Sequence, residues 1–307
     1  MKLPFSMKFL REQFSQGQNI MALIRAADET SINTPAAILA SYDIQAGSYV
    51  AAMSNDDHRN GILRYASAIS RIADSLSVNS ILEAGVGEAT TLAHVIGQLS
   101  APIKLAAGFD ISWSRIAYGN RYATAQRVDA SLILGDLFSI PIADNAFDLV
   151  YTSHSLEPNR GREKDALREL YRVARRYVIL IEPASSFGNA ATKKRIAEHK
   201  YCEELQRHAK DLGYSVIEHR LFDVCLKENN QSELTIIEKP PVGKRTRDND
   251  WLACPTCRTS LIRNKGHFYC EECGLIYPSI DGIPCLLSQS GVMGTHFIET
   301  ESSRGNQ

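Results

Sequence analysis

The stretch from Ile81 to Thr91, which reads ILEAGVGEATT, constrains the fold more than any other part of the sequence. An apolar run ends in an acid, Glu83, and two closely spaced glycines, Gly85 and Gly87, then lead into a helix-forming segment. Glycine takes positive φ without a Cβ clash, so the backbone of such a turn can approach a ligand closely. A glycine turn alone is weak evidence, because many are only tight corners between a strand and a helix. Together with Glu83, whose carboxylate can bind hydroxyls or a charged amine, the turn predicts a site for a nucleoside cofactor.

Short apolar runs alternate with helical segments over most of the chain between residues 57 and 240. The spacing of apolar residues predicts helices at residues 57–76, 90–98, 114–125, 162–174 and 190–212. The runs between them, from ILEA to YVILIEP, have the length of strands, and SVIEHRLF and ELTIIEK follow the last helix. This alternation is typical of a parallel sheet covered on both faces. We therefore expect an α/β, Rossmann-like, mostly parallel sheet with helices on both faces, in which the last two strands can run antiparallel.

The composition is that of a soluble globular protein, since 44% of the 307 residues are hydrophobic and 22% are charged. A formal net charge of −1 gives no general attraction to nucleic acid or to acidic membranes. The first residues, MKLPFSMKFLREQF, become charged at once, and no run approaches the roughly 20 apolar residues of a membrane span. We expect a cytoplasmic protein with no export signal and no membrane partner.

Acidic side chains stand where the first three predicted strands end. Glu83 ends the first strand, Asp110 ends the second within GFDIS, and Asp136 follows the third. In an open parallel sheet the ligand binds at the carboxyl ends of the strands. A carboxylate after the second strand can accept both hydroxyls of a ribose, and one after the third suits the exocyclic amine of a purine.

This series of motifs resembles the class I S-adenosylmethionine-dependent methyltransferases over about residues 40 to 240. Their usual acid-x-Gly-x-Gly-x-Gly motif stands here as EAGVGEA, with Ala89 in the place of the third glycine. A nicotinamide site is the alternative, but it calls for glycine or alanine at position 90, where this chain has Thr90. The resemblance implies three groups of cofactor contacts: Glu83, Gly85 and Gly87 to the methionine part, Asp110 to the ribose, and Asp136 with Leu137 to the adenine.

Methyl transfer from a sulfonium needs in-line positioning more than acid–base chemistry, and a base only where the acceptor must lose a proton. His154, in TSHSLEPN just past the fourth strand, is the candidate base, with Glu157 close by. The alternative for His154 is a hydrogen-bonded structural histidine. Glu182, at the end of the fifth strand, either lines the acceptor pocket or caps the strand. Tyr42 and Tyr49 either form a lid or serve packing alone.

Two Cys-x-x-Cys pairs, Cys254 with Cys257 and Cys270 with Cys273, are separated by twelve residues near the end of the sequence. In a chain with no export signal this clustering favours metal over disulfides. Four thiolates make a closed tetrahedral site, so we expect a structural Zn²⁺ that drives the folding of a small ribbon. Cys285, beyond the second pair, is expected to be buried rather than ligating.

The segments WLACPTC and LIYPSIDGIPCLL, over about residues 250 to 288, resemble a second family. They are similar to the small zinc-ribbon proteins that activate tRNA, ribosomal and translation-factor methyltransferases. Those proteins bind their enzymes and cover apolar surface. The resemblance implies that this ribbon either stabilises its own enzyme domain or helps to present a substrate, and it does not choose between them.

The composition changes suggest five parts: an N-terminal helical or lid segment (1–55), a methyltransferase domain (56–239), a linker (240–250), the ribbon (251–288) and a tail (289–307). The linker KPPVGKRTRDND combines prolines with charges, as exposed linkers do. The pattern does not fix an oligomeric state.

The segment after the fourth strand bears on the methyl acceptor. It reads TSHSLEPN and lacks the Asn/Asp-Pro-Pro-Tyr type of motif that accompanies amino methylation of bases or glutamine. This favours a small-molecule acceptor, methylated on oxygen or nitrogen, with a sugar or surface-glycan precursor as one example. One alternative is an RNA or translation-factor methyltransferase docked by the ribbon, with Lys244, Arg245 and Arg247 on phosphate. Another is a non-catalytic binding module that keeps the methyltransferase fold.

Overall fold

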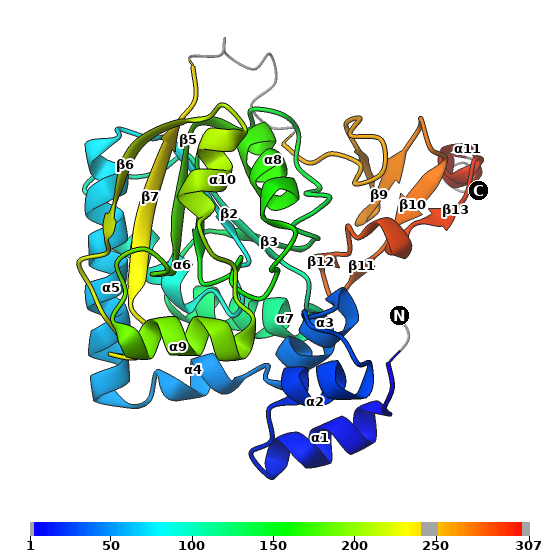
Figure 1. Ribbon diagram of the computed structural model, residues 1–307. Helices are drawn as coiled ribbons and strands as arrows, with labels where there is room; N and C mark the ends of the chain where they lie inside the picture. The colour runs from blue at the N-terminus through cyan, green and yellow to red at the C-terminus, as the bar shows by residue number, and fades with distance from the viewer. Residues whose placement is uncertain (1–2, 241–250, 303–307) are drawn as a thin grey trace.

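The computed structural model describes residues 3–240 and 251–302. A twisted seven-stranded sheet forms the main body, with the N-terminal helices gathered at one end of it and a small ribbon of strands beside its β3 edge (Figure 1). The strands of the main sheet are β1 (Ser80–Ala84), β2 (Leu105–Asp110), β3 (Ser131–Leu134), β4 (Phe147–Ser153), β5 (Ala174–Pro183), β6 (Ser215–Leu221) and β7 (Ser232–Glu238).

The order of the strands is β3-β2-β1-β4-β5-β7-β6. The first five strands pair in parallel, whereas β7 runs antiparallel to both β5 and β6. The prediction of a mostly parallel, Rossmann-like sheet is therefore confirmed. From β1 the chain adds β2 and β3 on one side and then β4 and β5 on the other, so the direction of winding reverses between β1 and β4, and such a point opens a crevice for ligands.

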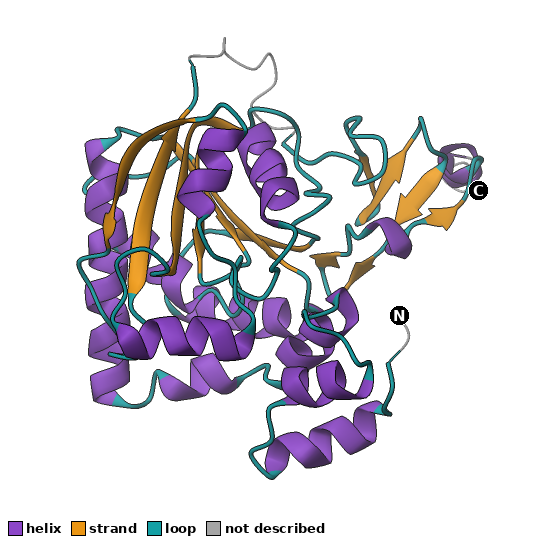
Figure 2. Cartoon of the chain, viewed as in Figure 1, coloured by secondary structure: helices purple, strands orange, loops and turns teal. Residues whose placement is uncertain are grey.

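Helices cover both faces of the sheet, as Figure 2 shows in purple against orange strands. Alternate residues of β1 point to opposite faces, with Ile81 in the core under α5, α6 and α7 and Leu82 in the core under α8 and α10. The helices are α1 (Met7–Ser15), α2 (Ile20–Ala27), α3 (Pro35–Ile44), α4 (Ser48–Ala52), α5 (Asp56–Ser75), α6 (Thr90–Gly97), α7 (Trp113–Ala125), α8 (Glu163–Val173), α9 (Ala190–His199), α10 (Leu205–Asp211) and α11 (Phe297–Ser302).

One predicted helix is wrong in its extent. The segment 190–212 was expected to be continuous, but it forms two helices, α9 and α10, separated by residues 200–204. Lys200 ends α9 in the left-handed region with φ 59°. The backbone N–H of Cys202 then donates to the carbonyl of Glu157, and its buried thiol lies 3.1 Å from the carbonyl of Leu156. These long-range contacts outweigh the local helical pattern.

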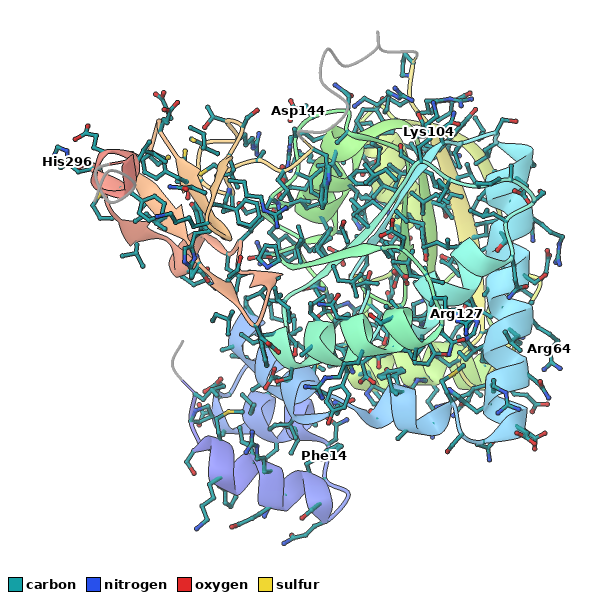
Figure 3. The ribbon with its side chains drawn as sticks, turned by 180° about the vertical axis from the view of Figure 1, so that it is seen from behind. Phe14, Arg64, Lys104, Arg127, Asp144 and His296 are labelled. Atoms are coloured by element: carbon teal, nitrogen blue, oxygen red, sulfur yellow. The ribbon has the colours of Figure 1, made fainter. Side chains whose placement is uncertain are left out.

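The ribbon consists of β8 (Ile262–Asn264), β9 (His267–Cys270), β10 (Leu275–Tyr277), β11 (Ser279–Ile280), β12 (Ile283–Pro284) and β13 (Val292–Met293). It extends beyond residue 288, because β13 pairs with β10 in the part that the sequence suggested as a tail. His296 marks its outer end, far from the main sheet (Figure 3). The predicted linker residues 241–250, with Lys244, Arg245 and Arg247, lie outside the described residues.

The ribbon pairs with the β3 edge of the main sheet at the last residue of that strand. Leu134 of β3 forms a parallel bridge with Cys285, and its carbonyl accepts the N–H of Leu286 at 2.9 Å. Cys285 is buried in the core under α5, α6 and α7, and Leu286 in the core on the opposite face, so this segment alternates like an added strand. An open edge is thereby paired within one chain.

Among the described residues, no helix has the length and apolarity needed to cross a membrane.

Candidate functional site

A cavity of about 410 Å³ opens at the carboxyl ends of the central strands. We call one part of it the cofactor end, lined by Glu83, Gly85, Gly87, Asp110, Asp136 and Leu137. We call the other part the acceptor end, lined by Tyr65, His154, Glu157, Arg195, Lys227 and Ser232. All the cofactor-contact and base residues selected from the sequence therefore border a single cavity of a size usual for small ligands.

The glycine turn has the backbone that the sequence led us to expect. Gly85 and Gly87 adopt φ values of 75° and 53°, in the left-handed region that favours glycine. A Cβ on Gly85 would lie 2.2 Å from the Cβ of Ser155, so the loop after β4 leaves no room for a side chain there. Ala89, in the place of the third glycine, also takes positive φ, at 55°.

The carboxylate of Asp110 is held by the backbone of the glycine turn. Its Oδ2 accepts the N–H of Gly87 at 3.0 Å, and its Oδ1 accepts the N–H of Ser112 at 2.9 Å. Burial raises the pKa of Asp110, while the charge of Arg115 and these N–H groups act in the opposite direction. The turn and the acid after β2 thus form one rigid unit.

Glu83 is a buried carboxyl, only 2% exposed, with the hydroxyl of Tyr151 donating to its Oε2 at 2.8 Å. Burial raises the pKa of Glu83 to about 8, with a further increase from the charge of Asp110. Among the described residues no cation forms an ion pair with it. A ligand ammonium group at the cofactor end would supply the missing charge, so Glu83 fits the amino-acid part of a cofactor.

At the third strand end, Asp136 lines the cavity and its Oδ1 accepts the N–H of Phe138 at 2.9 Å. Leu137, next to it, lines the same cavity and packs against the core. The structure therefore brings this pair to the cofactor end beside Asp110.

The two tyrosines of the N-terminal segment enclose a buried guanidinium. The Arg115 side chain lies 4.7 Å from the ring centroids of both Tyr42 and Tyr49, and its Nε donates to the carbonyl of Tyr42 at 3.0 Å. Its Nη2 is buried and has no hydrogen-bond partner. Both rings line the cavity, so the N-terminal segment forms part of its wall.

Glu88 holds the N-terminal segment in place and was missed in the sequence analysis. Its carboxylate, 2% exposed, accepts the N–H of Gly47 at 2.9 Å and that of Val50 at 2.8 Å. These N–H groups lie at the start of α4, where a negative charge is favourable. Glu88 stands directly after Gly87, so the glycine turn and the N-terminal segment are joined. Its position inside the glycine motif was the only sequence signal.

His154 and Glu157 are brought together with a third residue, Ser232 of β7. Nδ1 of His154 lies 2.8 Å from Oε2 of Glu157, and Nε2 lies 2.7 Å from Oγ of Ser232. Burial lowers the pKa of His154, but the hydrogen bond and charge of Glu157 outweigh it, and the net pKa is raised. His154 adopts φ 55°, a costly conformation for a non-glycine residue that is common at functional sites. Ser232 carried no sequence signal.

Glu182 caps the loop after β4 rather than lining the cavity. Its carboxylate accepts the backbone N–H groups of Ser155, Leu156 and Glu157, each at 3.1 Å. The side chain is buried, and burial raises the pKa of Glu182 to about 7. Its contacts hold in place the loop that carries His154 and Glu157.

The four cysteines of the ribbon gather into one cluster, with their sulfurs all within 4.8 Å of one another. Cys257 Sγ and Cys270 Sγ are 3.4 Å apart. Four sulfurs at about 2.3 Å from a central ion would be about 3.8 Å apart, so the cluster fits Zn²⁺. Cys285 lies apart from this cluster and is buried, as expected.

A Rossmann-like sheet with a glycine turn after β1 and acids after β1, β2 and β3 defines a class of domain that binds nucleoside cofactors. Residues 81–177 match the family described as a methyltransferase domain, and residues 250–282 match the family of Trm112p-like proteins. The chain therefore contains a segment that matches methyltransferase domains, followed in the same chain by a segment that matches Trm112p-like proteins and carries the four-cysteine cluster.

Similar proteins support the first assignment. A ubiquinone/menaquinone biosynthesis C-methyltransferase from Dinoroseobacter shibae is 39% identical over 77 residues, which are 24% of this chain and 30% of that protein. An ajmaline N-methyltransferase from Rauvolfia serpentina is 33% identical over 97 residues, 31% of this chain and 32% of that protein. The chain thus spans about a third of the length of these relatives.

A solved structure resembles the fold. It is magnesium protoporphyrin IX methyltransferase from Synechocystis PCC 6803 with bound SAH, at a TM-score of 0.54 and 14% identity, covering 67% of this chain and all 100% of that one. This similarity concerns the fold alone.

Proposed function

We propose that this protein is an S-adenosylmethionine-dependent methyltransferase that acts on a small molecule at oxygen or nitrogen. The observation that carries the proposal is the placement of Glu83, Asp110 and Asp136 around one cavity, within a stretch that matches methyltransferase domains. When bound, S-adenosylmethionine supplies a methyl group made electrophilic by the sulfonium. The relatives named for ubiquinone/menaquinone biosynthesis and for ajmaline favour a small acceptor over a macromolecule.

The residues of the cofactor end have distinct roles in this proposal. Glu83 pairs with the ammonium group, while Gly85 and Gly87 allow the backbone to approach the methionine part. Asp110, fixed by two backbone N–H groups, accepts the hydroxyls of the ribose. Asp136 and Leu137 frame the adenine.

The acceptor end supports an acceptor that must lose a proton. We propose that Ser232 Oγ takes the proton of the acceptor as its own proton passes to His154 Nε2, 2.7 Å away. Glu157, at 2.8 Å from Nδ1, stabilises the charged ring that results. The acceptor oxygen or nitrogen thus loses a proton as it gains the methyl group, and it remains neutral. The sequence analysis selected His154 as the base with Glu157 close by, and the contact of 2.7 Å supports Ser232 as the residue that would touch the acceptor.

The ribbon has a structural role in this proposal. Its four cysteines hold Zn²⁺ in a closed site, and its segment after β12 covers the β3 edge. These contacts favour stabilisation of the methyltransferase domain over presentation of a substrate. Four unpaired thiols that bind metal also suit a reducing compartment, so we propose a cytoplasmic location.

The proposal is tested by incubating the protein with S-adenosylmethionine labelled in the methyl group and an extract of cells that lack the protein. Label in small molecules that resist nuclease and protease is the expected result. Label that nuclease or protease releases from large molecules would instead establish an RNA or protein acceptor. A protein that does not bind S-adenosylmethionine in calorimetry would be a non-catalytic binding module.

The role of His154 is tested by His154→Ala. A general base contributes about 100- to 10,000-fold to a rate. We expect turnover to fall by at least the lower figure, while the dissociation constant for S-adenosylmethionine stays within about twofold. Unchanged turnover would remove the base assignment and leave His154 as a structural residue.

A further inference from the structure

One guanidinium in the wall of the cavity has no acidic partner. Arg195 projects from α9 and lines the acceptor end. Its Nε is buried without a hydrogen-bond partner. Its Nη1 lies 3.4 Å from Nε2 of His199, and its Nη2 lies 3.5 Å from the hydroxyl of Tyr201, both near the limit of a hydrogen bond. Over residues 3–240 and 251–302, no carboxylate forms an ion pair with Arg195.

Some other partly buried arginines of this domain have such partners, whereas Arg162 and Arg176, which do not line the cavity, have no carboxylate partner among the described residues. Arg172 pairs with Glu169 at 2.7 Å, and Arg175 pairs with Asp148. Burial of a charged donor without a partner is unfavourable, and in Arg195 this applies to the buried Nε. Arg115 also lacks an acidic ion-pair partner in the described chain, but two tyrosine rings and Asp110 occupy its surroundings at the cofactor end. Arg195 has one ring near it, that of Tyr201 at 5.8 Å, and only long hydrogen-bond contacts, so it is the half-buried guanidinium of the cavity wall that remains available to an acceptor.

Arg195 lies close to the proposed site of proton transfer. Its positive charge acts to lower the pKa of His154. Arg195 and Glu157 also both lie close enough to Tyr201 to affect the pKa of that residue. A group bound to Arg195 and an atom in contact with Ser232 can therefore belong to one small molecule.

A neighbouring loop brings further polar groups to the same wall. Asn189, before α9, donates to the carbonyl of Glu228 at 2.9 Å, and Thr192 Oγ1 accepts the N–H of Gln231 at 3.2 Å. This loop carries Lys227 and Asn230, which both line the cavity. The side-chain oxygen of Asn230 is buried and unpartnered, and an amide can present its N–H₂ group instead by rotating.

The cavity as a whole is lined by six acids and four cations, of which Glu83, Glu88, Asp110, Asp136 and Arg115 lie with the glycine turn and the strand ends. The other lining cations are Arg64, Arg195 and Lys227, and the other lining acids are Asp57 and Glu157. Glu157 is already engaged by His154, whereas Asp57 is exposed. Arg64 projects from the outer side of α5 (Figure 3) and Lys227 is also exposed, so both lie at the rim. Of these three cations, Arg64, Lys227 and Arg195, only Arg195 is partly buried.

We propose that the methyl acceptor carries an oxyanion, a carboxylate or a phosphate, apart from the atom that is methylated, and that Arg195 binds this oxyanion. The inference rests on the proposed function and names the class of its acceptor. A guanidinium offers parallel N–H donors that match the two oxygens of such a group. The methylated atom differs from the oxyanion, because an oxyanion has no proton to lose, whereas Ser232 and His154 would take a proton from the atom that is methylated. Lys227, at the rim, attracts the same charge during entry.

The first test examines the product. Wild-type protein is incubated with methyl-labelled S-adenosylmethionine and the small-molecule fraction of an extract of cells that lack the protein, and the labelled product is applied to an anion exchanger at pH 8. Retention of the label until salt is raised is the expected result. A labelled product that passes through unretained overturns the anionic acceptor and leaves the methyltransferase intact. Failure to label any small molecule overturns the proposed function, and this inference with it.

The second test uses Arg195→Gln, with Lys194→Gln on the exposed side of the same helix as the matched control. With the same fraction in serial dilution, Arg195→Gln should raise the apparent KM for the acceptor about 10- to 100-fold. Arg195→Lys should have an intermediate effect, since it keeps the charge but loses the paired donors. Calorimetry should give all three variants the wild-type dissociation constant for S-adenosylmethionine. Weaker cofactor binding by Arg195→Gln would show that Arg195 serves the carboxylate of the cofactor, and equal KM values for Arg195→Gln and Lys194→Gln would remove its role altogether.

Discussion

Nη2 of Arg258 lies 3.0 Å from Oε1 of Glu169 in α8 of the methyltransferase domain. Arg258 directly follows the first cysteine pair of the ribbon. The other oxygen of Glu169 accepts the N–H of Ile140 at 3.0 Å, in the loop that follows Asp136. Ser139 of the same loop donates to the carbonyl of Pro255 in the first cysteine pair. The zinc-binding part of the ribbon is thus joined by hydrogen bonds to the loop that follows Asp136 in the wall of the cavity.

Removal of zinc is therefore expected to weaken cofactor binding as well as stability. Small zinc ribbons depend on their metal for folding, and an unfolded ribbon would release the loop at residues 135–142. We expect a lower Tm and about tenfold weaker binding of S-adenosylmethionine, a loss of about 1.4 kcal/mol. Thermal unfolding and calorimetric titration before chelation, after it and after zinc is returned measure both effects. Undiminished affinity in the metal-free protein would show that the ribbon does not support the cofactor end.

Glu88→Ala is expected to detach the N-terminal segment from the glycine turn. The substitution removes two charge-assisted hydrogen bonds, to Gly47 and Val50, which together are worth about 3 kcal/mol or more. Faster limited proteolysis between residues 34 and 55 should result, along with weaker S-adenosylmethionine binding. Glu12→Ala, at an exposed position of α1, is the control and should be cleaved like the wild type. Equal cleavage of the two variants would argue that Tyr42, Tyr49 and Arg115 hold the segment unaided.

The raised pKa of Glu83 predicts how cofactor affinity depends on pH. Burial places this pKa near 8 instead of its ordinary 4.5, so the unliganded carboxyl is mostly protonated at neutral pH. Binding of an ammonium group favours the carboxylate and releases the proton, so affinity should rise between about pH 6 and pH 8, at most tenfold per unit. Above about pH 8 the α-amino group of the cofactor loses its own proton, and affinity should fall again.

The same shift has a consequence for stability. A carboxyl whose folded-state pKa is raised stabilises the fold fully below its unfolded pKa, and that contribution is lost as pH rises through about 8. Glu83→Gln should therefore make the unliganded protein less sensitive to pH between about 4.5 and 8, while it weakens cofactor binding and flattens its pH dependence. Full pH dependence of cofactor binding in this variant would assign the titration to Asp110, whose pKa is also raised.

Ser232→Ala tests the proposed contact between the acceptor and His154. Since the ring of His154 must be neutral to accept a proton, wild-type turnover should rise as pH passes its raised pKa. Without the hydroxyl, we expect about tenfold or more slower turnover and a displaced pH–rate profile, because the proton must reach Nε2 by another route. Ser215→Ala, exposed on the neighbouring strand β6, is the matched control. A wild-type profile in Ser232→Ala would leave His154 in direct contact with the acceptor.

Much of the fold could be predicted because its signals are local. The strand–turn–helix stretch around Gly85 and Gly87, the acids at the strand ends and the alternation of apolar runs all repeat over a few residues, and they indicated the sheet correctly. The spacing of Cys254, Cys257, Cys270 and Cys273 likewise determined the zinc cluster, because four thiolates at this spacing can close around one ion. The roles of the cofactor and base residues remain predictions.

The tertiary structure alone decided which distant residues meet. Ser232 reaches His154 because β7 runs antiparallel beside β5, with Ser232 opposite Pro183, and strand pairing of this kind has no local signature. The break between α9 and α10 has the same origin, since Cys202 bonds to the loop after β4. In the sequence Glu88 and Arg195 look like ordinary surface charges. In the structure Glu88 is set apart by its burial and its backbone partners. Arg195 is set apart by its buried Nε and by the absence of an acidic partner among the described residues. Sequence patterns report which local structure a segment prefers, whereas burial and pairing depend on contacts that form only when the whole chain has folded.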